Sequence, residues 1–138
     1  GNVLDLGCGI GVVSIILGTC NKNINIDMVD VNERAIELAK DNLKLCNIKA
    51  NIFISNVYSE VKNKYDYIIT NPPIRAGKDT VRKFLIGSYD YLKEQGKLYF
   101  VMRKDHGVKS MIKEMSSLFE VNIINKDKGF YVVLATKR

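Results

Sequence analysis

The stretch Asp5-Leu6-Gly7-Cys8-Gly9-Ile10-Gly11 decides the fold, because it joins the strand-like run Asn2–Leu6 to a helix-like apolar run at residues 12–17. Three glycines at such a junction predict a ligand-binding loop, since glycine accepts positive φ angles and lets a ligand approach the backbone. A dinucleotide-binding loop has the spacing GxGxxG, whereas here the third glycine comes one residue earlier. The acid at position 5 would repel a pyrophosphate and suits the ammonium group of an amino-acid ligand. A tight turn without a ligand is the alternative for this motif taken alone.

Strand-like and helix-like segments alternate along the rest of the chain. We expect strands at residues 2–6, 24–31, 51–54, 65–70 and, after a Gln95-Gly96 turn, 97–102, then a closing hairpin of residues 119–124 and 130–135. We expect a first helix at residues 12–17 and a second from an N-cap at Asn32 to Asn47, whose sheet-facing residues would be Ile36, Ala39, Leu43 and Cys46. A third helix should begin at about Lys78, with the apolar set Val81, Phe84, Leu85, Tyr89 and Leu92. Helical spacing of Met111, Ile112, Met115 and Leu118 predicts the last helix. This order predicts a single α/β domain over residues 1–138. Its fold would be Rossmann-like and doubly wound, with a mostly parallel seven-stranded sheet and an antiparallel C-terminal hairpin strand.

Ligands of such sheets bind beyond the carboxyl ends of the strands, so we expect the site at residues 5–11, Asp30, Asn56 and residues 71–75. Asp30 ends the second predicted strand, about 25 residues after Asp5. A carboxylate at this place can accept hydrogen bonds from both hydroxyls of a ribose. Alone, it would equally well be the cap of the following helix.

Asn71-Pro72-Pro73-Ile74 follows the fourth predicted strand, where two prolines stop the ladder. The Asn71 side-chain carbonyl and the Pro72 backbone carbonyl are acceptors that can hold both hydrogens of a planar NH2 group. Held in this way, the nitrogen lone pair would point toward a methyl donor, so catalysis would come from orientation and electrostatics. A strand stop followed by a turn is the alternative for this motif alone.

Together, DLGCGIG (5–11), Asp30 and NPPI (71–74) resemble the class I S-adenosylmethionine-dependent methyltransferases that modify amino nitrogens. NPPIRAGKDT (71–80), QGKLYFVMRKDHGVKS (95–110) and KDKGFYVV (126–133) are similar to the small-domain methyltransferases. That family is typified by the bacterial 16S ribosomal RNA guanine-N2 methyltransferases. The resemblance covers essentially the whole chain, and the NPPIRAGK run is its most specific part.

The resemblance assigns roles to individual residues. It implies that the methionine end of S-adenosylmethionine is bound by Asp5, Gly7, Cys8, Gly9 and Gly11. Asp30 and Val31 would bind its ribose, and Asn56 and Val57 would lie at its adenine. Asn71 would lie near its reacting end. Asn71, Pro72 and Pro73 would form the catalytic loop. Two features depart from the family: Ile74 stands where many members stack a Phe or Tyr on a flipped base, and the chain starts at the first strand, so we expect that it lacks the N-terminal segment that helps to close the cofactor site.

The charge of the chain is unevenly distributed. Residues 1–70 carry seven Lys and Arg against eight Asp and Glu, whereas residues 71–138 carry fourteen against seven. A basic second half predicts a polyanionic partner, although a solvated lysine-rich surface would look the same. Candidate RNA contacts at the rim are Ile74, Arg75, Lys78, Arg82, Lys83, Arg103 and Lys104. His106 is a weaker candidate, because a loop histidine without a partner is more often structural or solvated.

Cysteine spacing and hydropathy narrow the class of protein further. Cys8, Cys20 and Cys46 form no CxxC pair, so we expect three small buried side chains and, with His106 as the only histidine, no metal site. No apolar run reaches the roughly 20 residues of a membrane span, and no signal peptide opens the chain. We therefore expect a cytoplasmic protein whose partner is ribosomal RNA or the small ribosomal subunit.

We expect the protein to transfer a methyl group from S-adenosylmethionine to an exocyclic base amine in RNA. Guanine N2 of 16S ribosomal RNA is the first candidate. A glutamine N5-methyltransferase acting on release factors would use the same NPP loop, but with a tyrosine at the position of Ile74. A non-catalytic S-adenosylmethionine-binding module is the third possibility. The glycine spacing disfavours a nicotinamide oxidoreductase.

Overall fold

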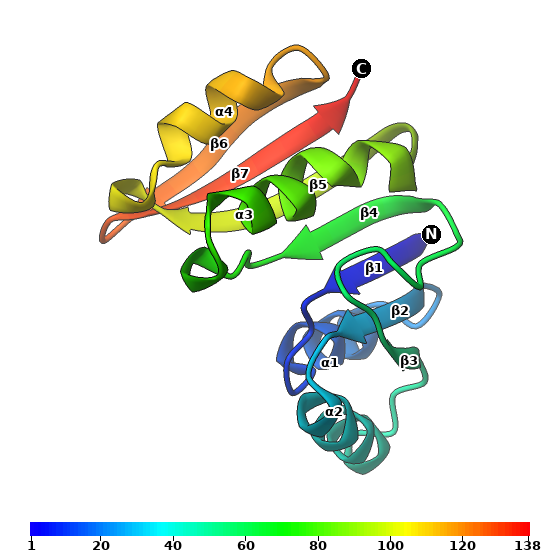
Figure 1. The fold of residues 1–138 in the computed structure, drawn as a ribbon. Helices are drawn as coiled ribbons and strands as arrows, with labels where there is room; N and C mark the ends of the chain where they lie inside the picture. The colour runs from blue at the N-terminus through cyan, green and yellow to red at the C-terminus, as the bar shows by residue number, and fades with distance from the viewer.

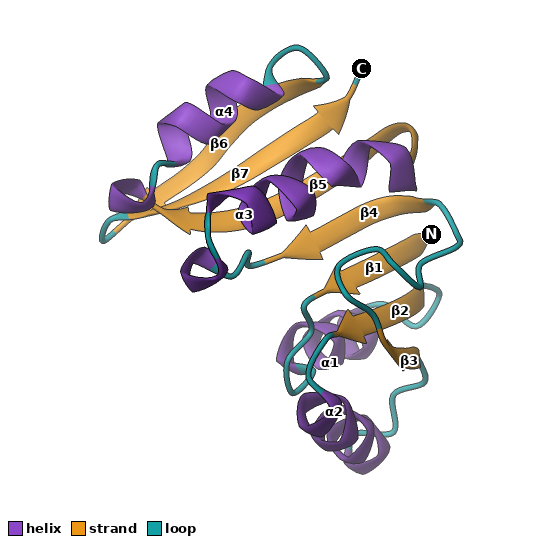
Figure 2. Ribbon diagram, in the orientation of Figure 1, coloured by secondary structure: helices purple, strands orange, loops and turns teal.

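Seven strands form one sheet flanked by helices in the computed structural model, which describes all 138 residues (Figure 1). The strands are β1 (Asn2–Leu6), β2 (Asn25–Asp30), β3 (Asn51–Ile54), β4 (Tyr65–Thr70), β5 (Leu92–Arg103), β6 (Phe119–Asp127) and β7 (Phe130–Lys137). The helices are α1 (Val12–Cys20), α2 (Glu33–Leu45), α3 (Lys78–Leu85) and α4 (Val108–Met115), with short 3-10 helices at Ile74–Ala76, Ile86–Tyr91 and Lys104–His106 (Figure 2). No helix is long and apolar enough to span a membrane.

The sheet order is β3-β2-β1-β4-β5-β7-β6. Strands β1 to β5 pair in parallel, and β7 pairs antiparallel with β5 on one side and with β6 on the other. The β6–β7 hairpin turns at Lys128 and Gly129, both with positive φ, as a tight hairpin turn requires. The predicted Rossmann-like, mostly parallel sheet with its antiparallel C-terminal strand is confirmed.

Helices cover both faces of the sheet, because alternate residues of the central strands are apolar on each side. In β2, Ile26 and Met28 pack with the buried face of α2, whereas Val29 joins the main core beneath α3 and α4. Of the four residues predicted to face the sheet from this helix, Ile36, Ala39 and Leu43 are buried, whereas Cys46 is exposed. The sheet is thus fixed from both sides, and the loops at the carboxyl ends of the parallel strands are left to form a site.

The largest differences from the sequence predictions lie between the third helix and β5. The third helix ends at Leu85, and Tyr89 lies in a 3-10 helix that follows it. Leu92, predicted to be helical, begins β5 and pairs with Tyr65. The Leu92 side chain is fully buried, so an apolar residue at this position is compatible both with the predicted helix and with the observed strand. The predicted Gln95-Gly96 turn is an irregularity inside β5, where Gln95 takes a φ of 60° and the register with β4 shifts.

The last helix and two of the cysteines also differ from expectation. The fourth helix ends at Met115, so Leu118 lies in the following turn. Only Cys8 is buried; Cys20 and Cys46 are exposed at the ends of α1 and α2, where the helices leave the sheet. The prediction of three buried cysteines was therefore wrong for two of them.

Candidate functional site

The carboxyl ends of β1, β2, β3 and β4 open into one cavity of about 410 Å3, which we call the rim cavity. Its lining consists of Leu6, Gly7, Val29, Asp30, Val31, Ser55, Asn56, Val57, Asn71, Pro73, Ala76, Thr80 and Phe84. Seven residues assigned from sequence are thereby brought together: Gly7, Asp30, Val31, Asn56, Val57, Asn71 and Pro73. The other candidates lie in neighbouring loops or behind this lining.

The glycine loop is fastened to the end of β2. The backbone N–H groups of Gly7 and Cys8 both donate to the Val29 carbonyl at 2.9 Å, and the Gly9 N–H donates to the Asp30 carboxylate at 2.8 Å. Gly7, Gly9 and Gly11 all have positive φ. A Cβ at Gly9 would meet no atom within 4 Å, so space beside the loop is open to a ligand.

Asp30 holds two backbone groups at once. Its Oδ2 accepts from Gly9, and its Oδ1 accepts from the backbone N–H of Asn32 at 2.9 Å. The cap of α2 is Asn32 itself, whose Oδ1 accepts from the N–H groups of Arg34 and Ala35, as the sequence predicted. Capping therefore does not explain Asp30. Each of its oxygens keeps further acceptor capacity toward the rim cavity.

Asp5 lies behind the loop and is 4% exposed. Ser14, in the first turn of α1, donates its hydroxyl to Asp5 Oδ2 at 2.7 Å. Burial raises the pKa of the Asp5 carboxyl, the Ser14 hydrogen bond opposes that rise, and the negative charge of Asp30 adds to it. The carboxylate thus braces the loop against α1. Sequence reasoning missed Ser14, whose only signal is a polar residue on the buried side of an apolar helix.

Cys8, another loop residue assigned to the cofactor, is an unreactive thiol. Burial raises its pKa to about 12, and the charges of Asp5 and Asp30 add to the effect. The protonated thiol is therefore the stable form at neutral pH, and the side chain acts by packing.

The Asn71-Pro72 pair leaves two acceptors without partners inside the protein. The Thr70 hydroxyl donates to the Leu6 carbonyl at 2.8 Å and so ties the end of β4 to β1. Directly afterwards, neither the Asn71 side chain nor the Pro72 carbonyl takes part in a hydrogen bond within the protein. The next carbonyl, that of Pro73, accepts from Ala76 and starts the 3-10 turn. Two free acceptors beside the rim cavity are what an NH2 group needs.

A strained residue completes the lining on the β3 side. Val57 has a φ of 54°, which is a rare conformation for a β-branched residue. The Ser55 hydroxyl donates to the Val57 carbonyl at 2.8 Å, and the Asn56 N–H donates to the Ser59 hydroxyl at 2.9 Å. These bonds hold the turn in its strained form, and strain of this kind gathers at ligand sites. The role of Ser55 was not found from sequence, although it stands at the end of a predicted strand.

The predicted phosphate contacts divide into free and paired cations. Arg82 is paired twice, with Asp79 at 3.0 Å and with Glu114 at 2.9 Å. Arg103 is paired with Asp105 at 3.1 Å, and its guanidinium lies 5.2 Å from the centre of the Phe130 ring. The candidates without a carboxylate within 4.0 Å are Arg75, Lys78, Lys83 and Lys104. His106 lies 4.0 Å from Asp105, so its closest charged neighbour is another surface residue.

Two side chains bear on the question of base stacking. Ile74 is half-buried and packs against the main core, which limits the surface that it offers to a base. Phe130 begins β7, is 43% exposed, and pairs across the sheet with Arg103 at the carboxyl end of β5. Sequence reasoning did not single out Phe130 as an exposed aromatic on this side of the sheet.

Comparison with known proteins matches the chain to one family and to named relatives. A family model described as the methyltransferase small domain matches residues 1–134. The chain is 40% identical over 143 residues to the Bacillus subtilis protein YbxB, covering 99% of this chain and 70% of that protein. It is 33% identical over 142 residues to ribosomal RNA small subunit methyltransferase C of Photorhabdus laumondii, covering 100% of this chain and 41% of that protein. The chain therefore spans less than half of that methyltransferase relative.

Solved structures share the fold at low sequence identity. The T. thermophilus 16S rRNA N2 G1207 methyltransferase, solved with AdoMet and guanosine, superposes with a TM-score of 0.85 at 23% identity, over 99% of this chain and 37% of that one. The ribosomal protein L11 methylase of Lactobacillus delbrueckii gives a TM-score of 0.87 at 15% identity, over 99% of this chain and 70% of that one. Because these two are named for an RNA and a protein substrate, the fold alone does not select the acceptor.

Proposed function

The chain belongs to the methyltransferase small-domain family, and we propose that it transfers a methyl group from S-adenosylmethionine to an exocyclic amino nitrogen of an RNA base. Guanine N2 of 16S ribosomal RNA is the first candidate. The observation that carries the proposal is the pair of free acceptors, Asn71 and the Pro72 carbonyl, beside a cavity that contains Asp30.

The residues of the rim cavity fit S-adenosylmethionine. Asp30 presents carboxylate oxygens to the ribose hydroxyls, while Val31, 67% exposed, and Val57 offer apolar surface to a planar ring. Asn56 supplies an amide beside that surface, and the open space at Gly9 accommodates the amino-acid end. When bound, the cofactor supplies a methyl group activated by a positively charged sulfonium.

Asn71 and Pro72 act on the acceptor amine. Their two carbonyl oxygens accept the two N–H bonds of the amino group, which reduces the conjugation of its lone pair with the ring and directs that lone pair into the rim cavity. No nearby base has to remove a proton before transfer, since the amine loses its proton to water once the new N–C bond has formed. Positioning is therefore the main contribution of this loop.

Unpaired basic side chains and the named relatives both favour RNA as the methyl acceptor. Arg75 and Lys78 follow the catalytic loop directly and Lys104 follows β5; none of the three has a carboxylate within 4.0 Å, so all are suited to phosphates. Phe130, with Arg103 against its ring, supplies an exposed aromatic where Ile74 cannot. Relatives named as ribosomal RNA methyltransferases point the same way. The partner would then be ribosomal RNA or the small ribosomal subunit in the cytoplasm.

A protein acceptor is the second candidate, because the L11 methylase shares the fold at a TM-score of 0.87. Transfer of tritiated methyl from S-adenosylmethionine distinguishes the two when unmodified ribosomal RNA, small subunits and a protein fraction are offered side by side. Label released from RNA as N2-methylguanosine is the expected result. Label in protein alone would contradict the proposal, and tight cofactor binding without transfer would favour a non-catalytic binding module.

A further inference from the structure

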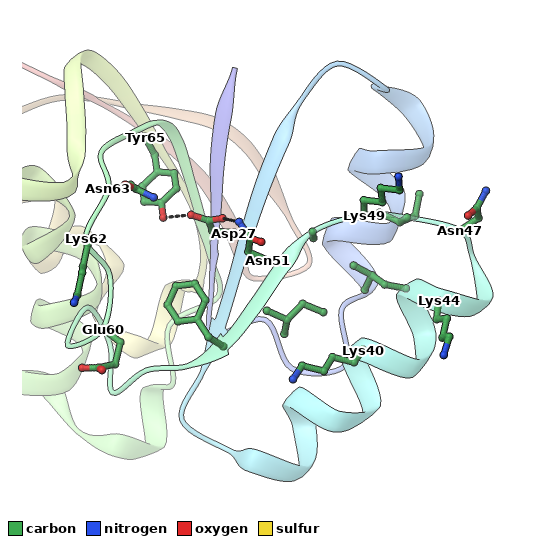
Figure 3. Close-up of a pocket in the computed structure, with 15 residues that line it drawn as sticks. Asp27, Lys40, Lys44, Asn47, Lys49, Asn51, Glu60, Lys62, Asn63 and Tyr65 are labelled. Atoms are coloured by element: carbon green, nitrogen blue, oxygen red, sulfur yellow. Dashed lines mark hydrogen bonds between the residues drawn. The ribbon is translucent and has the colours of Figure 1, made fainter.

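A second hollow, of about 820 Å3, lies away from the rim cavity along the free edge of the sheet (Figure 3). β3 pairs with β2 alone, so its other edge is open. The end of α2 forms one wall and the segment before β4 forms the other. No lining residue is shared with the rim cavity. We call this hollow the β3 groove.

The charged side chains of the β3 groove are mostly cationic and free. Four lysines line it: Lys40, Lys44, Lys49 and Lys62. All four are exposed, and none has a carboxylate within 4.0 Å. They are four of the seven basic residues in the first half of the chain. An even spread over the surface would not have placed them around one hollow.

The two acids of the groove are outnumbered by these four lysines. Asp27 accepts a hydrogen bond of 2.5 Å from the Tyr65 hydroxyl and one of 3.0 Å from the Asn51 amide, and it keeps its charge because both donors are neutral. Figure 3 shows this chain of three side chains between the two walls. Glu60 is the other acid. The field inside the groove is therefore positive and suited to an anionic strand.

Uncharged groups of the groove suit a nucleic acid. Asn47 and Asn63 present amides, which can both donate and accept as the edges of bases require, whereas the Asn51 amide already donates to Asp27. Phe53, half-buried on the edge strand, adds an aromatic side chain to the lining. Lysines for the backbone together with amides and an aromatic for the bases make up a single-strand binding groove.

We infer that the β3 groove binds the backbone of a single-stranded RNA segment that flanks the methylated nucleotide. The inference rests on the proposed function, since it assigns the groove to the same substrate. β3 lies three strand spacings from β4, about 14 Å across the sheet. Asn51 and Tyr65 of the groove begin their strands, whereas Asn71 follows the carboxyl end of β4, which adds about 20 Å along the strands. An extended RNA strand with one base at Asn71 therefore has to span roughly 25 Å to reach these groove residues, which an RNA of several nucleotides can do. Lysines that only protect an open sheet edge from pairing would have no effect on RNA affinity.

The test is RNA affinity in matched lysine variants, measured by the fluorescence anisotropy of a labelled single-stranded RNA of about 16 nucleotides. Lys44→Gln removes one groove charge, and Lys44→Gln with Lys62→Gln removes two. Lys113→Gln is the control, because Lys113 is also exposed in the last turn of its helix but belongs to α4. Thermal unfolding and S-adenosylhomocysteine binding show that each variant is folded.

Each phosphate contact on a single strand adds about 0.7 to the slope of log Kd against log salt concentration. Relative to 1 M salt, one contact therefore changes Kd roughly fivefold at 0.1 M salt. We therefore expect Kd to rise about 5-fold in the single groove variant and about 25-fold in the double, with slopes lower by about 0.7 and about 1.4. The control should stay within about twofold. Equal affinities in the groove and control variants, with methylation of RNA by the unaltered protein, would overturn the groove and leave the proposed function standing. If the unaltered protein neither binds nor methylates RNA, both are wrong.

Discussion

Replacing Asp30 by Asn tests the cofactor site most directly, because the change keeps size and removes one acceptor and the charge. In the protein, both carboxylate oxygens are used, one by the Gly9 N–H and one by the Asn32 N–H. An asparagine can satisfy only one of these groups, since its NH2 would face the other donor. The substitution therefore loosens the glycine loop and removes the negative charge that we assign to the ribose hydroxyls.

The expected loss of affinity follows from these contacts. A hydrogen bond to a charged group contributes about 1.5–3 kcal/mol. If one such contact to the ribose is lost, the Kd for S-adenosylhomocysteine should rise roughly 10- to 150-fold, since about 1.4 kcal/mol is a factor of ten. The free energy of unfolding should fall by less, on the order of 1 kcal/mol, because water can reach the backbone N–H that is left unpaired at the rim.

Asp27→Asn is the matched control, measured by the same titration calorimetry and urea unfolding. Asp27 lies three residues earlier on the same strand, also accepts two hydrogen bonds, and lies outside the rim cavity. We expect the control to lose stability and to keep its cofactor affinity within about twofold. Equal S-adenosylhomocysteine affinities in the two variants would show that Asp30 does not contact the cofactor.

Three further substitutions probe other parts of the site. Asn71→Ala should lower kcat by about 10²- to 10³-fold, as loss of one oriented hydrogen-bond group does, and should change the cofactor Kd in calorimetry far less than it changes kcat; unchanged turnover would remove Asn71 from catalysis. Ser14→Ala should lower the free energy of unfolding by about 1.5–3 kcal/mol at neutral pH, because the buried Asp5 carboxylate loses its donor. The Ser14 bond lowers the Asp5 pKa, so this deficit should shrink as pH falls and Asp5 becomes protonated; a deficit that grows toward acid in urea unfolding would contradict the assignment. Gly11→Ala should lower stability by about 1–3 kcal/mol in thermal unfolding, since its Cβ would lie 2.9 Å from a Leu43 methyl group at a φ of 93°, and an unchanged Tm would mean that the loop shifts freely.

Local signals in the sequence predicted the frame of the site well. The bounds of β1, β3 and β4 agree with the predictions. Gly7 follows β1 directly and Pro72 follows β4 at one residue's distance, so local breakers end these two strands, whereas β3 ends at the polar pair Ser55-Asn56. Leu92 was misplaced because its side chain is buried in either structure, and periodicity cannot separate the end of a helical segment from the start of a strand. A boundary of that kind is decided by pairing with Tyr65, which lies 27 residues away in the chain.

Long-range partners were the part that the sequence could not provide. Arg82 was expected to contact phosphate, but Glu114, 32 residues later, holds its guanidinium in two hydrogen bonds. In the same way, a nearly neutral first half of the chain concealed the four free lysines of the β3 groove. Net charge averages over sequence, whereas a binding surface depends on which charges fold to the same place.

The two acids at the glycine loop perform separate tasks that together select the ligand. Asp5 braces the loop from behind through Ser14, and Asp30 holds the Gly9 N–H from the front, so the loop has its shape before any ligand arrives. Their charges are close enough for Asp30 to raise the pKa of Asp5. A pyrophosphate would meet this negative field at close range, whereas a sulfonium or an ammonium would be attracted by it. Electrostatics thus gives a physical reason why a loop that resembles a dinucleotide-binding turn would take a cationic methyl donor instead.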